Sequence, residues 1–242
     1  MKKFTLVLAL LTLSLTVKAQ ARELECGMSE VRAFNSAVTP DENAWTKADG
    51  RLMRITMNQA LFALLGVQYG GDYRQTFALP KIEDIQLNGQ SYSYYICVRG
   101  IWPSGGTDSA NTGFMRQYAG NFNLDSYNER MLIREEALPI ERYPALASIL
   151  NRDLVQDNSV LMPTVTLPAV LKNVPTGTEL NNILEVNGNY PAYQIACEKG
   201  GVYFALGKMR EPENAKEIIV EGMAGISFGG VTKEAAHMYE CL

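Results

Sequence analysis

Apolar and polar residues alternate on both sides of an Asn-Gly pair at residues 88–89, and this pattern predicts a β-hairpin. Residues 85–87 alternate before the pair, and residues 92–98 alternate after it. Asn-Gly supplies the two positive-φ positions that a type I′ turn requires. Because side chains alternate along a strand, Tyr92 and Tyr94 fall on one face, which we expect to pack into the core.

A helical pattern precedes the hairpin. Three leucines within residues 61–65 share one face at helical spacing, which predicts a short buried helix. Gly66 can take the left-handed conformation that commonly ends a helix. Thr56 and Gln59 have the spacing of a capping box, so we expect Thr56 to cap the start of the helix.

The same patterns return later in the chain. A second Asn-Gly pair lies in residues 184–189, which match residues 85–90 at a constant spacing of 99. Further upstream the matching segments are 85 residues apart, so that residues 145–150 correspond to the helical pattern at 60–65. Two more pairs of segments keep the same order: Val31–Phe34 with Met115–Tyr118, and Ala78–Pro80 with Thr166–Pro168. We therefore expect two divergent copies of one unit, each enclosing its own apolar interior.

These elements predict a mainly β or α+β fold, in which each unit has β-strands, one short helix and an Asn-Gly hairpin. We assign residues 22–105 to the first unit, 106–210 to the second and 211–242 to a C-terminal segment. Gly222–Ile226 resembles Gly27–Val31, so this segment is a partial third copy. Because it lacks a helix and hairpin of its own, we expect it either to add a closing strand to the second unit or to pair with another subunit.

The N-terminus has the form of a secretory signal peptide. Two lysines precede an apolar stretch at residues 4–17, and small residues follow at Ala19 and Ala21, so we expect residues 1–21 to be removed. The stretch is shorter than the roughly 20 apolar residues that a membrane-spanning helix needs. We therefore expect an exported protein with no transmembrane segment after cleavage, located at the cell surface, outside the cell or in the periplasm.

The mature chain is acidic. Removal of residues 1–21 takes away three of the 22 basic residues and leaves 19 against 26 acidic ones, a formal net charge of −7. Such a chain lacks a patch that could neutralise phosphates. Neither a nucleic acid nor an anionic membrane surface is an expected partner.

The four cysteines favour two disulfides, because exported proteins pass through an oxidising compartment. Cys26 with Cys97 would close the first unit, and Cys197 with Cys241 would close a later segment. The two other connectivities stay open. No Cys-x-x-Cys pair exists and His237 is the single histidine, so no metal or other cofactor is expected.

The sequence contains no nucleophile elbow, phosphate-binding loop or dinucleotide motif, so no catalytic residue is assigned. His237 alone offers little to a catalytic triad. Adjacent acidic residues at Glu83–Asp84 and Glu135–Glu136 could serve a glycosidase. A secreted carbohydrate-binding protein or glycan-active enzyme that uses clustered acidic residues and tyrosines is therefore the alternative function.

Tyr95 and Trp102 are candidate contact residues. Tyr95 points away from the face of Tyr92 and Tyr94, and Trp102 follows shortly after the strand. Aromatic residues are enriched at interfaces and stack on sugars, whereas packing against the neighbouring unit is the alternative use of both side chains.

Five segments of the first unit form one motif: Ser29–Phe34, Asp49–Ile55, Asn58–Gly66, Tyr69–Asp72 and Thr76–Pro80. Together they resemble the phage tail collar domain, a module of tail-fibre proteins that also occurs in bacterial secreted proteins. The second unit resembles it more loosely. The resemblance implies a structural module that holds a partner rather than converts a substrate.

Within this motif, five residues are expected to structure the loop after the helix. Gly70 and Gly71 permit a tight turn. Asp72 can accept hydrogen bonds from Arg74 or from nearby backbone N–H groups, and Phe77 would anchor the loop on the helix. Taken with the leader, the resemblance favours a non-catalytic exported structural or adhesive protein. Such a protein would be part of a surface appendage or adhesin complex that docks on a larger surface protein or fibre, or binds a surface glycan.

Overall fold

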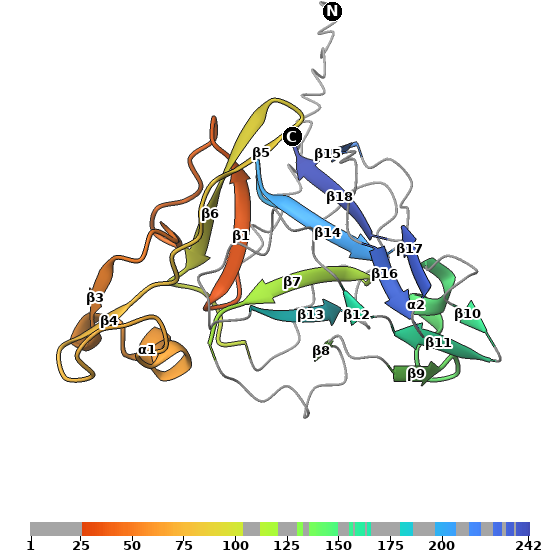
Figure 1. The fold of residues 1–242 in the computed structure, drawn as a ribbon, viewed down its shortest axis with the longest axis horizontal. Coiled ribbons are helices and arrows are strands. Elements are labelled where there is room, and N and C mark those ends of the chain that lie inside the picture. Colours follow the sequence, from red (N-terminus) through yellow and green to blue (C-terminus); the bar gives the residue numbers. More distant parts are fainter. Residues whose placement is uncertain are drawn as a thin grey trace, which may run out of the picture.

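The computed structural model describes residues 26–103, 112–120, 130–132, 136–149, 155–156, 158–162, 164–165, 180–185, 197–206, 213–218, 225–228, 231–234 and 236–242. β-strands dominate these residues (Figure 1), which confirms the mainly β fold class. The predicted signal peptide at residues 1–21 and the second Asn-Gly pair lie outside the described residues. Among the described residues, no helix has the length and apolar character needed to cross a membrane.

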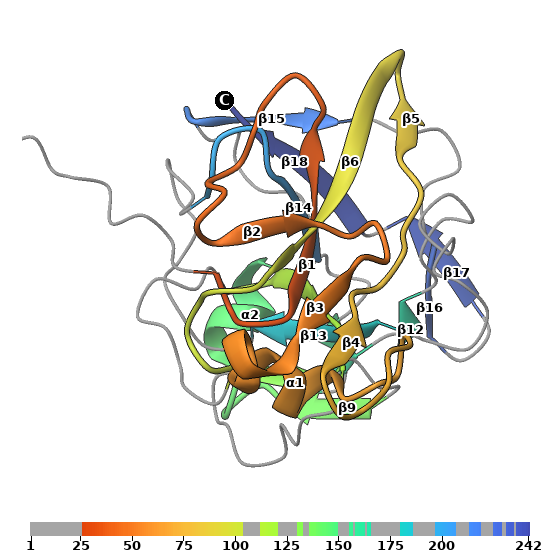
Figure 2. The same ribbon diagram turned by 90° about the vertical axis from the view of Figure 1, so that its left-hand side faces the viewer.

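The first half of the chain builds two antiparallel groups of strands. Its elements are β1 (Glu30–Asn35), β2 (Trp45–Lys47), β3 (Leu52–Arg54), the 3-10 turn η1 (Ile55–Met57), α1 (Gln59–Leu65), β4 (Thr76–Ala78), β5 (Ile85–Leu87) and β6 (Gln90–Cys97). β6 pairs antiparallel with β1, β2 and β5, whereas β3 pairs with β4 alone. In Figures 1 and 2, α1, β3 and β4 gather at one end, away from the tip of the β5–β6 hairpin.

The hairpin prediction is confirmed. Asn88 and Gly89 have φ angles of 51° and 79°, as a type I′ turn requires, and Leu87 pairs with Gln90 across it. Tyr92 and Tyr94 are buried, as their alternation predicts.

The helix forms where its pattern predicts, with its leucines buried, but its predicted cap is wrong. Asn58 rather than Thr56 precedes the first helical residue, and no side chain caps the helix. Thr56 is taken up in η1, which closes through a hydrogen bond from the Asn58 N–H to the Ile55 carbonyl. At the other end, Gly66 has a φ of 54° and donates its N–H to the Phe62 carbonyl at 2.7 Å.

The second half adds β7 (Phe114–Tyr118), β8 (Arg130–Leu132), β9 (Glu136–Pro139), α2 (Pro144–Ile149), β10 (Val155–Gln156), β11 (Ser159–Met162), β12 (Thr164–Val165), β13 (Asn181–Glu185) and β14 (Val202–Leu206). Its strand pairings follow those of the first half. β13 pairs antiparallel with β7 and β8, as β6 pairs with β1 and β2. α2 follows β9 as α1 follows β3 and η1. These pairings support a duplicated unit, but the duplication and its boundaries stay predictions.

The match of the two Asn-Gly segments disagrees with the match of Val31–Phe34 to Met115–Tyr118 once the strand pairings are compared. Leu184 pairs with Met115 as Ile96 pairs with Val31, so Leu184 occupies the position of Ile96 in β6. The Asn-Gly match instead aligns Leu184 with Ile85, which lies in β5. A strand's register is fixed by its partners on both sides, and a short local match does not report it.

The two halves share one sheet and one apolar cluster. The main sheet runs β15-β18-β14-β7-β1-β6-β2, so that β1 and β7 are direct neighbours. The largest cluster of buried apolar side chains draws on both halves and includes Val31, Ile96, Met115, Leu146 and Phe204. Two smaller clusters accompany it. The expectation of two separate apolar interiors is therefore wrong, because direct pairing of β1 with β7 merges the interiors beside it.

The C-terminal segment contributes β15 (Ala215–Ile218), β16 (Gly225–Phe228), β17 (Val231–Glu234) and β18 (Ala236–Cys241). β18 lies between β14 and β15 and pairs antiparallel with both (Figure 1). The segment thus extends the main sheet on the side of β14, in the manner of a closing strand.

Candidate functional site

A carboxylate lies between two arginines where β1 meets β7. Glu30, Arg32 and Arg116 are only 2%, 4% and 6% exposed. Oε2 of Glu30 accepts from Nη1 of Arg116 at 3.2 Å, and Oε1 accepts from Nε and Nη2 of Arg32. The Gly27 N–H adds a bond to Oε2 at 3.1 Å. Charges this deeply buried are stable only when paired and hydrogen-bonded, so the cluster ties the two strands together.

The arginines set the ionisation of Glu30. Burial alone would raise the pKa of its carboxyl, but the charges of Arg32 and Arg116 and their hydrogen bonds outweigh burial and hold that pKa below the ordinary value of 4.5. Glu30 therefore stays ionised at neutral pH.

Aromatic rings enclose the Arg32 guanidinium. Its central carbon lies 4.8 Å from the centroid of the Trp45 ring on β2 and 4.4 Å from that of Tyr203 on β14. Nη1 also donates to the Tyr203 hydroxyl. A planar guanidinium suits such a place better than an ammonium group, because it can stack on rings and donate in its plane at once.

Glu198 links the buried cluster to the surface. Its Oε2 accepts from Trp45 Nε1 at 2.8 Å and from Arg32 Nη1 at 3.4 Å, while a quarter of its side chain (25%) stays exposed. Burial raises the pKa of Glu198, and the nearby Arg32 charge opposes that rise. The Glu198 N–H also donates to the Tyr203 hydroxyl at 2.9 Å, which fixes the turn on β14.

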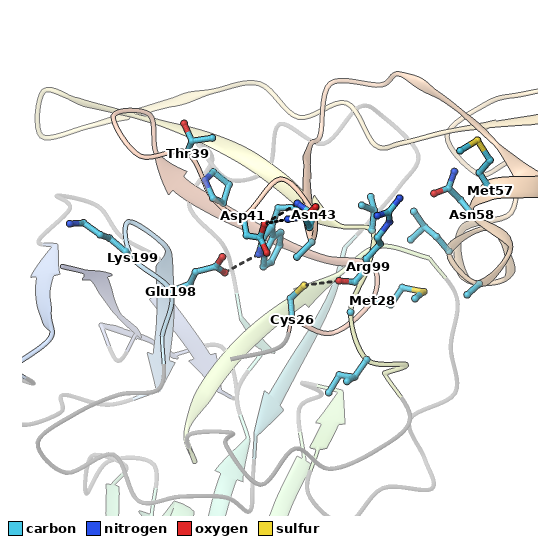
Figure 3. A pocket seen from close by; sticks show the side chains of 18 of the residues that line it. Cys26, Met28, Thr39, Asp41, Asn43, Met57, Asn58, Arg99, Glu198 and Lys199 are labelled. Carbon is cyan, nitrogen blue, oxygen red and sulfur yellow. Dashed lines mark hydrogen bonds between the residues drawn. The ribbon is translucent and has the colours of Figure 1, made fainter. Parts of the chain in front are cut away.

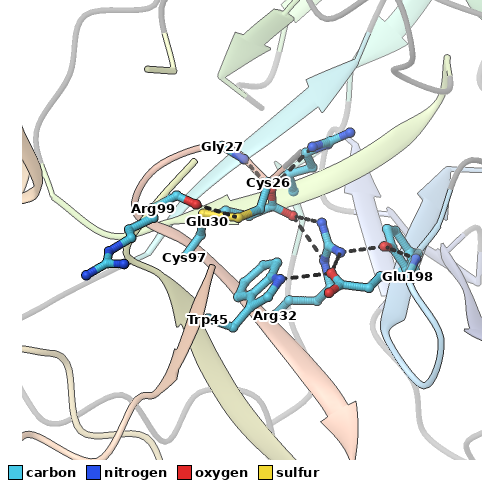
Figure 4. Close-up of a disulfide and its surroundings, with 10 residues drawn as sticks. Cys26, Gly27, Glu30, Arg32, Trp45, Cys97, Arg99 and Glu198 are labelled. Carbon is cyan, nitrogen blue, oxygen red and sulfur yellow. Dashed lines mark hydrogen bonds and ion pairs between the residues drawn. A yellow bond between two sulfur atoms is a disulfide. The ribbon is translucent and has the colours of Figure 1, made fainter. Parts of the chain in front are cut away.

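Both disulfides lie beside this cluster. The structure pairs Cys26 with Cys97 and Cys197 with Cys241, which are the two pairs put forward from the sequence. Figure 4 shows the Cys26–Cys97 bridge next to Glu30, with Arg32, Trp45 and Glu198 beyond it. Since Cys197 directly precedes Glu198, its bridge holds the turn that carries this carboxylate.

A groove of about 1010 Å³ opens in front of the cluster (Figure 3). Four segments line it: residues 38–41 with 43–45, residues 57–61 at the start of α1, residues 98–101 after β6, and the turn at 197–199, together with Cys26 and Met28. Glu198 contributes to both the groove and the buried cluster, so the cluster positions one wall of the groove.

The predicted contact residues do not line the groove. Tyr95 is half-buried, with its ring centroid 5.6 Å from that of Phe34 in its own half of the molecule. Trp102 is 44% exposed and directly follows Ile101, which does line the groove. Their role in contacts stays a prediction.

The Asp72 loop has the hydrogen bonds of a structural turn. Oδ1 of Asp72 accepts from the backbone N–H groups of Arg74, Gln75 and Thr76 at 3.0, 2.8 and 2.7 Å. These backbone bonds lower the pKa of Asp72 to about 2. Gly70 and Gly71 have φ angles of 120° and 111°. A Cβ at Gly71 would come within 2.5 Å of backbone atoms of Thr76 and Phe77.

Phe77 anchors the far side of the same loop. Its ring is fully buried, and its centroid lies 5.5 Å from that of Phe62 on α1. None of the five loop residues lines the groove.

The other titratable candidates form local ion pairs. Asp84 pairs with Lys47 at 3.0 Å, and Glu83 lies 3.9 Å from Lys81, all four on the surface. His237 on β18 faces Glu217 on β15 at 2.7 Å. Glu135 lies outside the described residues. None of these described groups borders the groove.

Glu30, Arg32, Arg116 and Glu198 are not predicted as a site by the sequence patterns. One signal was present, since Arg32 and Arg116 are matched positions of the predicted repeat, each preceded by an apolar residue. Charged residues at matched positions of two buried strands indicate a shared counter-ion.

Comparison with known families matches residues 29–84 to the model described as the Phage Tail Collar Domain. This confirms the resemblance of the first unit. The matched segment contains Glu30, Arg32, α1 and the Asp72 loop, whereas Arg116 and Glu198 lie beyond it. No curated protein and no solved structure matches the chain.

Proposed function

We propose that this protein, which carries a phage tail collar segment at residues 29–84, is an exported, non-catalytic structural component of a cell-surface appendage or adhesin complex. It docks on a larger fibre-like surface protein or on a surface glycan. The observation that carries the proposal is the collar match itself, because that family is one of structural tail proteins.

The chemistry of the described residues supports a holding role. Three buried charged residues, Glu30, Arg32 and Arg116, bond to one another across two strands. Two disulfides link distant parts of the chain, as is typical of proteins that work in oxidising compartments.

The alternative, a glycan-active enzyme, has less support. Hydrolysis of a glycoside requires two carboxyl groups that face each other across the sugar, roughly 5–10 Å apart. Asp84 and Glu83 instead pair with surface lysines. Glu198 borders the groove, but its carboxylate is engaged by Trp45 and Arg32.

The test is to purify the tagged chain from its native cell after mild cross-linking and fractionation. We expect the mature chain, with the leader removed at Ala19 or Ala21, in the outer fraction and in a fixed ratio with one large surface protein. Lys2→Glu with Lys3→Glu is the control, since it should block export and abolish that recovery. A full-length chain that stays in the cytoplasm, or a purified monomer that hydrolyses glycan, would overturn the proposal.

A further inference from the structure

Tyr73 has a backbone conformation that aromatic residues rarely adopt. Its φ angle is 59°, in the left-handed region, where the side chain crowds the backbone. Three other non-glycine residues of the described ranges have a positive φ: Ser29, Asn88 and Asn158. Asparagine tolerates this region and serine has a small side chain, so the strain is greatest at Tyr73.

The fold gains little from the side chain that carries this strain. Tyr73 is 68% exposed, and its ring meets Phe62 of α1 in an edge-to-face contact with the two centroids 5.6 Å apart. Glycine at this position would relieve the strain, and asparagine would tolerate it. Strained residues that the surrounding structure holds in place gather at binding sites. The strain at Tyr73 is therefore better explained by a ligand than by the fold.

The loop fixes the ring before any ligand binds. Oδ1 of Asp72 accepts from the three backbone N–H groups that follow Tyr73, at 3.0, 2.8 and 2.7 Å. The loop joins α1 to β4 at the end of the molecule away from the tip of the β5–β6 hairpin (Figure 2). A ring held in this way loses little conformational freedom when a ligand stacks on it.

The surroundings of the ring suit a sugar better than a protein. A pyranose has a face of C–H groups and a rim of hydroxyls, so it fits an exposed aromatic ring beside polar side chains. Asp72, Arg74 and Gln75 flank Tyr73, and all three are exposed. Guanidinium and amide groups donate readily to hydroxyl oxygens. A protein partner needs a wide interface with a packed apolar centre, whereas Tyr73 is the one large apolar residue of residues 70–75.

We propose that Tyr73 is a stacking platform for a pyranose unit of a surface polysaccharide. The C–H face of the sugar lies on the exposed ring, and its hydroxyls bond to the side chains of Arg74 and Gln75. The inference rests on the proposed function and deepens it, because it names the site and the class of ligand through which the protein docks on a surface glycan.

The test is to probe the oxidised mature protein with an array of clustered oligosaccharides that contain neutral hexoses, hexosamines and uronic acids, and to titrate the bound ones in solution. We expect at least one class of pyranoside to bind. Tyr73→Ala should weaken its binding about tenfold, whereas Tyr73→Phe, which keeps a ring, should stay within about twofold. Arg74→Ala and Gln75→Ala should each weaken it about threefold, as the loss of one hydrogen bond does.

Stability measurements separate a ring that binds a ligand from one that serves the fold. Tyr73→Ala should leave the midpoint of urea unfolding nearly unchanged, because most of the side chain is exposed. Tyr73→Gly removes the same ring and also relieves the strain, so its midpoint should exceed that of Tyr73→Ala. Both variants should weaken sugar binding equally. A large drop in the midpoint for Tyr73→Ala would show that the fold needs the ring, and would overturn the inference.

Matched controls come from exposed residues outside the loop. Leu52→Ala removes a large apolar side chain that is 62% exposed, and Lys81→Ala removes an exposed charge. Both variants should bind the selected sugar within about twofold of the unchanged protein.

An array on which no sugar binds, or sugar binding that Tyr73→Ala leaves unchanged, would overturn the inference. Recovery of the native surface partner separates this failure from that of the proposed function. If no sugar binds but Tyr73→Ala abolishes recovery of a large surface protein, the ring contacts protein and the sugar site is wrong. If that protein is recovered equally well with Tyr73→Ala and no sugar binds, only the inference fails. If the chain stays in the cytoplasm but binds sugar through Tyr73, the proposed function fails and the site stands.

Discussion

Replacement of Glu30 by glutamine should destabilise the fold by about 3–5 kcal/mol at neutral pH, as is usual when one partner of a buried ion pair is removed. The side chain keeps its size, so packing changes little. What changes is charge, because Arg32 and Arg116 would then lie close together, both buried, without the carboxylate between them.

The size of the predicted loss of stability follows from the hydrogen bonds of Glu30. The Glu30 carboxylate accepts four of them: one from Gly27, two from Arg32 and one from Arg116. Glutamine keeps one accepting oxygen, so the donors on the other oxygen lose their acceptor. Hydrogen bonds to charged groups contribute roughly 1.5–3 kcal/mol each. The loss of two such bonds therefore accounts for a destabilisation of about 3–5 kcal/mol.

The assay is urea unfolding of the oxidised protein, followed by fluorescence of Trp45, whose ring stacks on Arg32. The control is Glu83→Gln, since Glu83 is exposed and 3.9 Å from Lys81, and its loss should change stability by less than about 0.5 kcal/mol. A Glu30→Gln variant that lies within about 1 kcal/mol of the unchanged protein would refute the assigned role of the cluster.

The effect should also depend on pH. Because the folded-state pKa of Glu30 lies below the ordinary value of 4.5, its ionised carboxyl stabilises the fold above that value, and this stabilisation is lost as the pH falls through the folded pKa. Glutamine cannot titrate. The stability gap between the two proteins should therefore narrow in acid, and a gap that is constant from neutral pH to acid would contradict the assignment.

Three further measurements test other parts of the structure. Gly71→Ala should destabilise by about 2 kcal/mol or more, because its Cβ would meet backbone 2.5 Å away, whereas Gly89→Ala, with nothing within 4 Å, should cost only about 1 kcal/mol for its positive φ. Equal melting temperatures for the two would contradict this. An NMR titration should place the pKa of Asp72 at about 2, and a value near 3.8 would show that its three backbone bonds are absent. Cys26→Ser with Cys97→Ser opens a disulfide of sequence separation 71 and should cost about 4 kcal/mol in urea unfolding, whereas unchanged stability would mean that the bridge is not formed.

Local features of the fold were predictable because local chemistry determines them. The Asn88–Gly89 turn needs only two residues that tolerate positive φ, and the sequence shows both. The cap of α1 was not predicted correctly because Thr56 can either cap the helix or belong to a 3-10 turn before it. In the structure the segment Ile55–Met57 forms that 3-10 turn.

Features fixed across the sheet were not predictable from local matches. Leu184 lies opposite Met115 because β13 pairs with both β7 and β8. A match of a few residues in the sequence does not show which strands pair. The buried cluster was missed for the same reason: Arg116 is 86 residues from Glu30, and Glu198 is 166 residues from Arg32. A charged residue in a strand is usually solvated, and only the fold reveals its partner.

The collar segment is built into one body with the rest of the chain, since the groove combines α1 with the turn at 197–199. Native-state hydrogen exchange of the oxidised mature protein tests this most directly. We expect amides of β1, β7 and β14 to exchange through one common opening of equal free energy, and Glu30→Gln to lower all three together. If β1 and β6 instead open at a free energy of their own, separate from β7 and β14, the collar segment is an independent module and does not share one body with the rest of the chain.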